Sequence, residues 1–325
     1  MEEVTVIVLN WNGARVLPRC LEAMAGQTYK EFHLIVVDNG STDGSWKLVQ
    51  THTAQVELIR LPYNMGFSRA NNIVLKTVST PYVALLNNDA FPRPDWLESL
   101  MAGLERHPEA GFVASKLLFD DARDVIDRAG DGYSIAGVAY LRGRGAHSSF
   151  YDKEEEVFGA CAAAALYRKE LLQRVGMFDE DFFLLHEDVD LSFRAQLMGY
   201  RCVYVPHAVV YHGASSTLVH DSSASVYFGH RNLEWVYLKN MPWSLLVRTF
   251  WLHILYNLFA CAFFLYIGRG RDFIKAKRDA LIHFPLMWKK RKMVQKGRIV
   301  DDKYIAGLLE REAFLERVKS RPFVN

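Results

Sequence analysis

Residues Phe32–Gly44 read FHLIVVDNGSTDG, a run of apolar and β-branched side chains that stops at a polar, glycine-containing turn. Such a run predicts a buried strand that ends in a loop. The same pattern occurs before it, in Val4–Gly13 (VTVIVLNWNG), and after it, in Tyr82–Asp89 (YVALLNND). Segments with helical spacing separate these strands, for example Val16–Ala25 and Asn64–Val78. The alternation predicts an α/β fold with a mostly parallel sheet that helices cover on both faces.

Polar side chains follow each of these predicted strands. In open α/β sheets, ligands bind where the carboxyl ends of the strands meet, so these side chains are the first candidates for a site. Asp38 could accept the imide N–H of a uracil or thymine base, and Gly40 would let the backbone approach a ligand closely. The alternative is an Asx turn, in which Asp38 and Ser41 only satisfy backbone N–H groups.

Asp89 emerges from a hydrophobic strand at the same predicted edge. A carboxylate oxygen there suits Mg²⁺ or Mn²⁺ bound against a diphosphate, whose charge the ion would offset as a nucleoside diphosphate departs. A strand-end turn is the structural alternative. His212 follows a later predicted strand and is either a metal ligand or a structural histidine.

Three acidic residues, Glu187, Asp188 and Asp190, crowd the start of a predicted helix over Glu187–Met198, directly after the aromatic pair Phe182–Phe183. The helix dipole accounts for one or two acidic residues at a helix N-terminus. Three beside aromatic side chains are more than capping requires. Because a carboxylate in a half-apolar setting can be tuned as a general base, this segment is the candidate for proton transfer.

The composition is that of a folded protein in a reducing compartment. Of the 325 residues, 50% are hydrophobic and 23% are charged, which excludes a disordered or low-complexity chain. The four cysteines lie far apart without CxxC spacing, so we expect neither a disulfide framework nor a structural zinc site. No signal-peptide pattern precedes the first strand, which predicts a protein that starts in the cytoplasm.

Charge divides the chain into two predicted parts. Residues 1–240 carry 22 Lys and Arg against 30 Asp and Glu, whereas residues 241–325 carry 17 against 7. We therefore expect an acidic α/β domain over 1–240 and a basic helical tail over 241–325 with a partner of its own. Within the first part, Asp120–Glu156 predicts loops with short strands near an acceptor, and Val157–Tyr167 predicts one more strand.

The tail combines an apolar segment with a basic one. Leu245–Ile267 is apolar but interrupted by Arg248, His253 and Asn257, which leaves it at the margin of what a membrane span requires. Eleven Lys and Arg then lie within Arg269–Arg298, among aromatic and aliphatic side chains. This mixture favours a surface that lies on anionic lipid. The alternatives are a packed helical hairpin or oligomer contact, and a true span. Nucleic acid is not an expected partner, because the basic residues are interleaved with strongly apolar ones.

Seven segments, taken in their order and spacing, resemble the inverting glycosyltransferase family 2, nucleotide-sugar enzymes with a GT-A fold. They are Val4–Gly13, Ile35–Ser45, Asn64–Asn72, Leu85–Pro92, Gly159–Arg168, Gly176–Tyr200 and Val210–Ser216. Each segment alone is a weak pattern, but seven segments in the family's order and spacing are strong evidence for the resemblance. The subgroup that they resemble includes bacterial rhamnosyltransferases of cell-surface polysaccharide assembly.

The resemblance implies roles for individual residues. The nucleotide sugar would be bound by residues at the strand ends and in the neighbouring loops: Asn10, Asn12, Asp38, Asn64, Gly66, Arg69, Asn87 and Asn88. Asp89 and His212 would hold the metal ion, Asp188 would be the general base, and Glu187 would position the acceptor or the base. Asn87 stands where the family's Asp-x-Asp motif has its first aspartate, so a single carboxylate remains in that motif.

The implied reaction is a single displacement, in which Asp188 takes a proton from an acceptor hydroxyl that attacks the anomeric carbon. The resemblance favours dTDP-rhamnose as donor, Mg²⁺ or Mn²⁺ as cofactor, and a lipid-linked or growing glycan as acceptor at the cytoplasmic face of the membrane. One alternative is a UDP-hexose or UDP-hexosamine donor with a soluble or protein acceptor. Another is a membrane-bound scaffold without turnover. A homo-oligomer is compatible with each.

Overall fold

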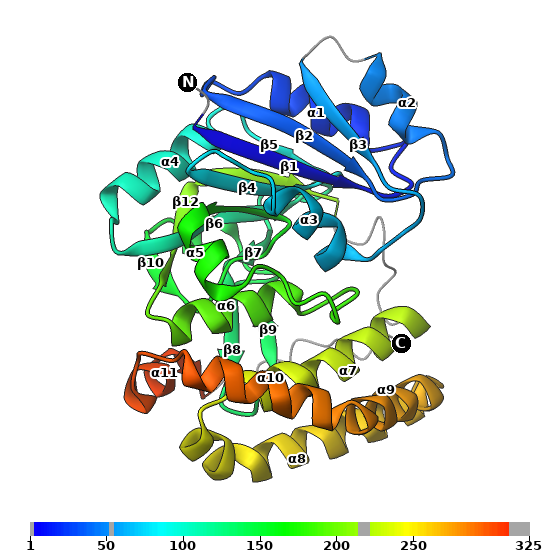
Figure 1. Cartoon of the computed structure of the whole chain (residues 1–325), viewed down its shortest axis with the longest axis vertical. Coiled ribbons are helices and arrows are strands. Elements are labelled where there is room, and N and C mark those ends of the chain that lie inside the picture. The colour runs from blue at the N-terminus through cyan, green and yellow to red at the C-terminus, as the bar shows by residue number, and fades with distance from the viewer. Residues whose placement is uncertain (1–2, 52–54, 214–221, 312–325) are drawn as a thin grey trace.

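Figure 1 shows the computed structural model of the chain, in which residues 3–51, 55–213 and 222–311 are described. A ten-stranded sheet with the order β10-β12-β6-β11-β4-β1-β2-β3 forms its centre, and β5 and β7 pair with β12 and β6. The α/β fold expected from the alternation of strands and helices is confirmed. Residues 214–216 of one predicted motif and 312–325 of the predicted tail lie outside the described residues.

Four parallel strands form the N-terminal half of the sheet. They are β1 (Val4–Asn10), β2 (Phe32–Asp38), β3 (Val56–Arg60) and β4 (Tyr82–Asn87). The helices of this half are α1 (Leu17–Ala25), α2 (Ser45–Gln50), α3 (Phe67–Leu75) and α4 (Trp96–Arg106). On β1, Val6 and Val8 belong to the core on one face and Ile7 to the core on the other. A strand buried on both faces therefore gives the continuous apolar run seen in the sequence.

The other half of the sheet mixes strand directions. Its long strands are β6 (Ala110–Phe119), β11 (Ala164–Arg168) and β12 (Arg201–His212), and its short ones are β5 (Ala90–Pro92), β7 (Ile126–Ala129) and β10 (Glu155–Val157). Two helices, α5 (Lys169–Val175) and α6 (Glu187–Leu197), flank β11 and β12 in sequence. Strand β11 runs antiparallel to β4. The carboxyl end of β4 therefore meets the loop that enters β11, which is where the site forms.

The strand expected over Val157–Tyr167 is interrupted, and this expectation is corrected. Val157 ends β10, and β11 begins only at Ala164. The residues between them leave the sheet to pack on α6, where a Cβ at Gly159 would lie 2.5 Å from Ser192. Small side chains permit this close approach, so the apolar run belongs partly to a buried loop.

The segment 120–156 contains the expected short strands. It includes β8 (Asp131–Ser134), β9 (Ala139–Leu141) and the 3₁₀ turn η1 (Ser148–Phe150). A second, three-stranded sheet forms when β13 (Leu309–Glu310) pairs parallel with β8. The C-terminal region therefore returns to the α/β part and completes this small sheet.

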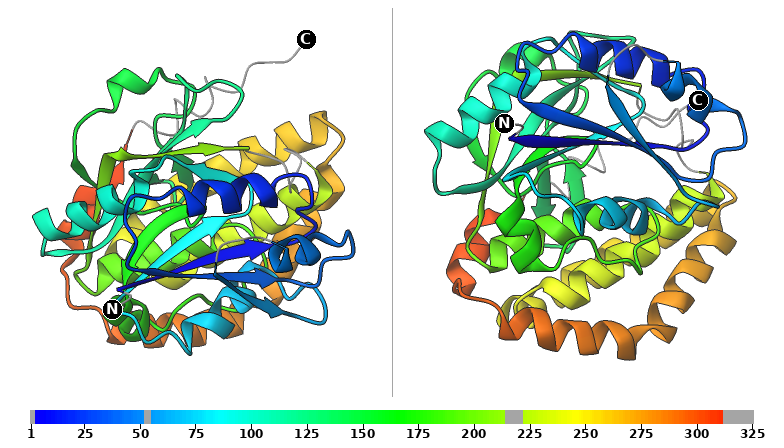
Figure 2. Two further views of the ribbon diagram at one scale, coloured as in Figure 1. Left: turned by 90° about the horizontal axis from the view of Figure 1, so that it is seen from above. Right: turned by 45° about the horizontal axis from the view of Figure 1, so that its top comes forward.

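Five helices make up most of the C-terminal region: α7 (Ser223–Asn240), α8 (Trp243–Tyr266), α9 (Gly270–Ile282), α10 (Phe284–Lys296) and α11 (Asp302–Leu308). They form a layer at the end of the molecule opposite α1 and α2 (Figure 2). Helix α7 contacts α6, α9 and α10, and so joins the two parts of the chain. Among the described residues, α8 is the one helix whose length and composition would allow it to cross a membrane.

Candidate active site

Asn10, at the carboxyl end of β1, is the centre of a buried polar network. Its amide nitrogen donates to Oδ1 of Asp38 at 3.0 Å and to Oγ of Ser45 at 2.9 Å, and its Oδ1 accepts from Nδ2 of Asn88 at 2.8 Å. A Cβ at Gly13 would lie 2.2 Å from the same Asn88 nitrogen, so only glycine fits beside the network. The ends of β1, β2 and β4 are thereby fixed to one another.

Asp38 is fully buried beneath the loop that follows β2. Its Oδ2 accepts from the backbone nitrogen of Ser41 at 3.4 Å and lies 3.9 Å from Nε of Arg60. These contacts are those of the Asx turn that the sequence allowed, and a contact between Asp38 and a nucleotide base remains a prediction. Asn12 is exposed instead, and its Oδ1 accepts from the backbone nitrogen of Thr42 at 2.8 Å.

The loop before α3 joins the β2 side of the site to the segment that precedes α6. Oδ1 of Asn64 accepts from the backbone nitrogen of Gly66 at 2.9 Å. Gly66 has a φ of 81°, and a Cβ there would lie 2.5 Å from the carbonyl oxygen of Phe183, so the two loops can meet only through glycine. Arg69 is exposed, with Nε 3.9 Å from a carboxylate oxygen of Glu180 on that same segment.

Asp89 and His212, which are far apart in sequence, lie side by side. Strand β12 pairs with β5 so that His212 is opposite Ala90, and Nε2 of His212 is 3.5 Å from Oδ1 of Asp89. Nδ1 of His212 lies 2.8 Å from Oδ2 of Asp127 on β7, whose other oxygen is 3.0 Å from Nη1 of Arg144. Burial lowers the pKa of His212, but the hydrogen bonds to Asp127 and Asp89 outweigh it and raise that pKa to about 9.

This pair has the donor chemistry of a divalent-metal site. A carboxylate oxygen and an imidazole nitrogen are both metal ligands, and a hydrogen bond from Nδ1–H to Asp127 leaves Nε2 of His212 facing Asp89. A carboxylate that orients a histidine through its other nitrogen is what metal-ligating histidines usually have. The residues present therefore fit an ion, which would displace the proton that His212 otherwise carries.

Asp188 lies in the first turn of α6. Its Oδ1 accepts from the backbone nitrogen of Val189 at 2.8 Å and its Oδ2 from that of Ala162 at 3.3 Å. The neighbouring Glu187 is buried, and this burial together with the charge of Asp188 raises the pKa of Glu187 well above its usual value. The raised pKa favours the protonated form of Glu187, so the two neighbouring carboxyl groups lie in different environments.

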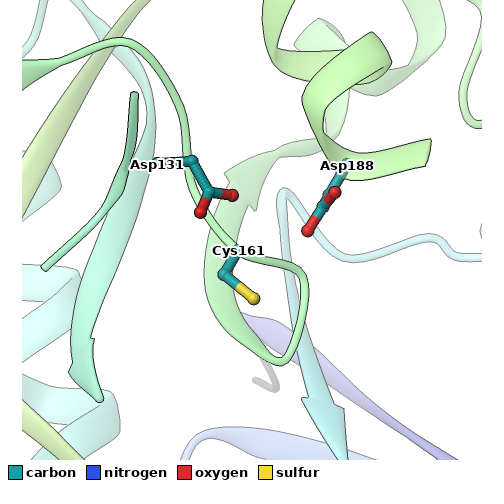
Figure 3. A group of neighbouring side chains, drawn as sticks. All are labelled: Asp131, Cys161 and Asp188. Carbon is teal, nitrogen blue, oxygen red and sulfur yellow. The ribbon is translucent and has the colours of Figure 1, made fainter. Parts of the chain in front are cut away.

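Asp131, Cys161 and Asp188 point toward one another (Figure 3). One ligand atom of each lies within 4.8 Å of the others, a spacing that a metal ion could bridge. However, Nη1 of Arg128 already contacts Oδ1 of Asp131 and Sγ of Cys161, each at 3.1 Å. Burial also raises the pKa of the Cys161 thiol well above its usual value, so this sulfur carries its proton. A cluster that a guanidinium neutralises is a poorer metal site than the Asp89–His212 pair.

The loop that enters β11 connects the two halves of the site. The backbone nitrogen of Asn87 donates to the carbonyl oxygen of Ala163 at 2.9 Å. The preceding residue, Ala162, donates to Asp188. Asp188 and Asn87, which is two residues before Asp89, therefore contact the same short loop.

Strand β7 makes a second connection, which no sequence motif marks. Asp127 contacts His212, and the next residue, Arg128, contacts Asp131 and Cys161. Of these residues, Asp127, Arg128 and Asp131 lie in a charged segment without periodicity.

Asn39 is a further residue of the site for which the sequence predicted no role, although it lies within one of the family-like segments. Its amide nitrogen donates to Oδ1 of Asn64 at 3.1 Å and so joins the loops after β2 and before α3.

The sequence pattern of Glycosyl transferase family 2 matches residues 5–176, more than half of the chain. The matched range contains Asn10, Asp38 and Asp89 at the strand ends. It stops before Asp188 and His212. The match therefore supports membership of the family, and roles for these two residues can be argued only from the structure.

Named relatives match the chain over most of its length. The chain is 24% identical over 271 residues to N-acetylglucosaminyl-diphospho-decaprenol L-rhamnosyltransferase of Mycobacterium tuberculosis. The match covers 74% of this chain and 88% of that protein. The chain is 27% identical to the O-antigen biosynthesis protein RfbC of Myxococcus xanthus over 69% of its length. The chain spans 18% of that protein and 25% of another relative, an uncharacterized protein of Sinorhizobium fredii that is 30% identical.

Solved structures share the fold at low sequence identity. The Staphylococcus aureus TarS fragment in complex with UDP-GlcNAc has a TM-score of 0.59 and 17% identity, covering 95% of this chain and 93% of that chain. The mannosyltransferase PcManGT of Pyrobaculum calidifontis, in complex with GDP-Man and Mn²⁺, has a TM-score of 0.55 and 19% identity, covering 91% and 85%. The expected GT-A fold is confirmed. The chain belongs to Glycosyl transferase family 2.

Proposed function

We propose that this protein is a glycosyltransferase that inverts the anomeric centre as it moves a sugar from a nucleoside-diphosphate donor to an acceptor hydroxyl, with the help of a divalent ion. The observation that carries the proposal is that one short loop contacts both Asn87, two residues before Asp89, and Asp188. In a single displacement, the attacking oxygen and the leaving diphosphate lie on opposite sides of one carbon. Groups that serve each of them must therefore share one site.

Each acidic residue has a separate role in this proposal. Asp188 takes the proton of the acceptor hydroxyl. At the same time the acceptor oxygen bonds to the anomeric carbon, and the bond from that carbon to the diphosphate breaks. Glu187, whose pKa is raised by burial and by the charge of Asp188, would position the acceptor or the base beside it. Asp89 and His212 would hold the ion, which when bound offsets the charge of the leaving diphosphate. Arg69 would meet the same diphosphate from α3.

The donor would lie on the loops at the ends of β1, β2 and β4. Asn12, Asn64 and Asn87 are at least partly exposed there, and we assign them to direct contact with the nucleotide. A second set is buried and shapes the surface beneath the nucleotide: Asn10, Asp38 and Asn88. Uracil and thymine present the same N3–H, so these residues suit UDP and dTDP equally.

We propose dTDP-rhamnose as the donor to test first, with a lipid-linked or growing cell-surface glycan as acceptor. The support is a relative named as a rhamnosyltransferase that matches this chain over 88% of its own length. The second candidate is a UDP-hexosamine, supported by the TarS complex with UDP-GlcNAc on the same fold.

Thermal unfolding with a panel of nucleotide sugars tests this proposal directly. At a hundredfold excess over its dissociation constant, a ligand should add about 2.7 kcal/mol to the free energy of unfolding. We expect dTDP-rhamnose or a UDP-sugar to stabilise the protein only when Mn²⁺ or Mg²⁺ is present, and GDP-mannose to stabilise it less. Transfer by the stabilising donor, followed by determination of the product anomer, tests inversion. A protein that no nucleoside diphosphate stabilises would instead be the scaffold without turnover.

We also propose that α8 lies on an anionic membrane surface at the cytoplasmic face. Six of its exposed apolar side chains, each 43–63% exposed, recur at intervals of three, four or seven residues: Trp243, Val247, Trp251, Ile254, Leu258 and Leu265. Such spacing places them on one helix face. Exposed basic residues on α9 and α10 would meet lipid headgroups: Arg271, Lys275, Arg278, Lys289, Lys292 and Lys296. An exposed apolar stripe rimmed by basic residues is typical of a protein or membrane interaction site.

Sedimentation with vesicles checks the membrane proposal. We expect the protein to bind phosphatidylcholine vesicles only when they contain phosphatidylglycerol, and binding to weaken as salt screens the charges. Trp251→Glu combined with Leu258→Glu should weaken binding at least about tenfold, because burying each apolar side chain contributes about 1.5–3 kcal/mol. Leu48→Glu, on exposed α2 at the other end of the molecule, is the matched control. Binding indifferent to these changes would refute the proposal, and concentration-dependent dimerisation would instead assign the α8 face to a second copy.

A further inference from the structure

The segment that leads into α6 has an unusual backbone conformation. Leu185 and His186, which directly precede Glu187, have φ values of 68° and 67°. Side chains other than glycine rarely adopt this left-handed region, and such residues persist only where the surroundings hold them. Asp188 is two residues further on, in the first turn of the helix. The conformation at Leu185 and His186 therefore sets where its carboxylate lies.

Asn232 of α7 holds this turn from the other side. It is fully buried, and its Nδ2 donates to the carbonyl oxygen of Leu184 at 2.8 Å and to that of Leu185 at 2.7 Å. Its Oδ1 accepts from Nε of Arg231 at 2.9 Å, which fixes the amide with its nitrogen toward the turn. Because the two carbonyls belong to the peptides on either side of Leu185, one amide group fixes the orientation of both peptides.

Other contacts anchor the ends of the same segment. Lys239 of α7 lies 2.6 Å from a carboxylate oxygen of Asp179 and 2.6 Å from one of Asp190. On the donor side, the backbone nitrogen of Phe67 donates to the carbonyl oxygen of Phe183 at 2.8 Å. With residues 179, 183 and 190 held independently, the loss of Asn232 should move mainly the turn between them.

We propose that Asn232 is a positioning residue for sugar transfer, which holds the left-handed turn at Leu185–His186 and so places the carboxylate of Asp188. The inference rests on the proposed function, in which Asp188 is the general base. It also assigns a role to α7, because this helix packs against α6 and links the site to the C-terminal layer (Figure 1).

Asn232→Leu removes the donor group and nearly keeps the side-chain volume. We expect turnover to fall about 10- to 100-fold, because a displacement of about 1 Å in a reacting group can cost about 100-fold, while the donor dissociation constant stays within about twofold. Glu234→Gln is the matched control, since Glu234 lies on the same helix but contacts His253 and Lys277 of the C-terminal layer. That variant should lose some stability without the selective loss of turnover.

A rescue separates positioning from general damage. Glycine adopts a positive φ at no steric cost, so Leu185→Gly added to Asn232→Leu should restore part of the lost turnover. A general loss of packing would not be repaired by removing a further side chain. If Asn232→Leu does not yield folded protein, Asn232→Ser, which keeps a shorter hydroxyl donor, is measured in the same way.

Amide hydrogen exchange tests the inference without any assay of transfer. Asn232→Leu should speed exchange in a peptide covering residues 184–190, and Glu234→Gln should leave it unchanged. If the wild-type protein transfers no sugar, the proposed function fails while this measurement still decides whether Asn232 holds the turn. The inference is overturned if exchange is unaltered, if turnover and donor affinity fall together, or if both variants lose turnover equally.

Discussion

Asp188→Asn should reduce turnover at least about 100-fold while leaving the donor dissociation constant within about twofold. The amide has nearly the same shape and can still accept from the backbone nitrogen of Val189, but it cannot take a proton. General-base assistance is typically worth about 10²–10⁴-fold, and that is the contribution which this change removes. Turnover is measured at saturating donor and acceptor, and donor binding by calorimetry in the absence of acceptor.

Glu187→Gln provides the sharpest comparison, because it makes the same chemical change one residue away. Since burial raises the pKa of Glu187 and so favours its protonated form, the amide should behave much like the acid and cost at most about tenfold in turnover. Asp181→Asn, at an exposed position of the same segment, controls for any loss of an acidic residue there. Equal losses in the Asp188 and Glu187 variants would show that the base has been assigned to the wrong carboxyl.

The fold could be predicted because its central strands are buried on both faces. Such strands must be apolar throughout and must become polar where they leave the sheet, which the sequence shows at Asn10, Asp38 and Asn87. The prediction failed at Val157–Tyr167, where a buried loop has the same apolar composition as a strand. Composition reports burial, and burial alone does not distinguish a strand from a loop packed beneath a helix.

Part of the site could be predicted because chain order places it at the sheet edge. Asp89 lies in the turn between β4 and β5, and Asp188 is the second residue of α6, so the pattern around them is informative. Asp127 and Arg128 belong to β7, a strand of four residues that pairs with β6. The contacts of Asp127 with His212 and of Arg128 with Cys161 depend on that pairing, which no local pattern encodes.

The buried state of Asp38 shows a related limit. A motif can mark a residue as special without saying whether its side chain touches the ligand or supports the loop that does. Both roles need a short acceptor at a strand end, and only the hydrogen bonds of Asn10 and Ser41 to Asp38 show that support is one of them.

Asp89→Asn should abolish the stabilisation by nucleotide sugar that depends on Mn²⁺, and should weaken donor binding at least about 100-fold. The amide is nearly isosteric with the acid, so the fold is kept while the pair loses its charged oxygen. Thermal unfolding with donor, with and without Mn²⁺, measures the effect. Asp120→Asn, an acidic residue paired with Arg19 at the surface, is the control for an altered charge.

Asp127→Asn should fall between these two variants, because Asp127 orients His212 without being assigned as a ligand. Loss of a carboxylate that orients a ligating histidine typically costs about 10- to 100-fold in metal affinity. If stabilisation by the donor is the same with and without Mn²⁺ in every variant, the Asp89–His212 pair binds no ion that matters to the donor, and the charge on the diphosphate must be met by basic side chains such as Arg69.

The Asp89 and Asp188 variants should also differ in kind. Asp188→Asn should retain the stabilisation by donor and Mn²⁺ but fail to turn over, since the base acts only on the acceptor oxygen. Asp89→Asn should lose that stabilisation first and turnover as a consequence, so that raising the donor concentration recovers part of its rate. If both residues serve one displacement, the two variants must differ in this way. Asp188 acts on the attacking oxygen, whereas Asp89 acts through the ion on the leaving diphosphate.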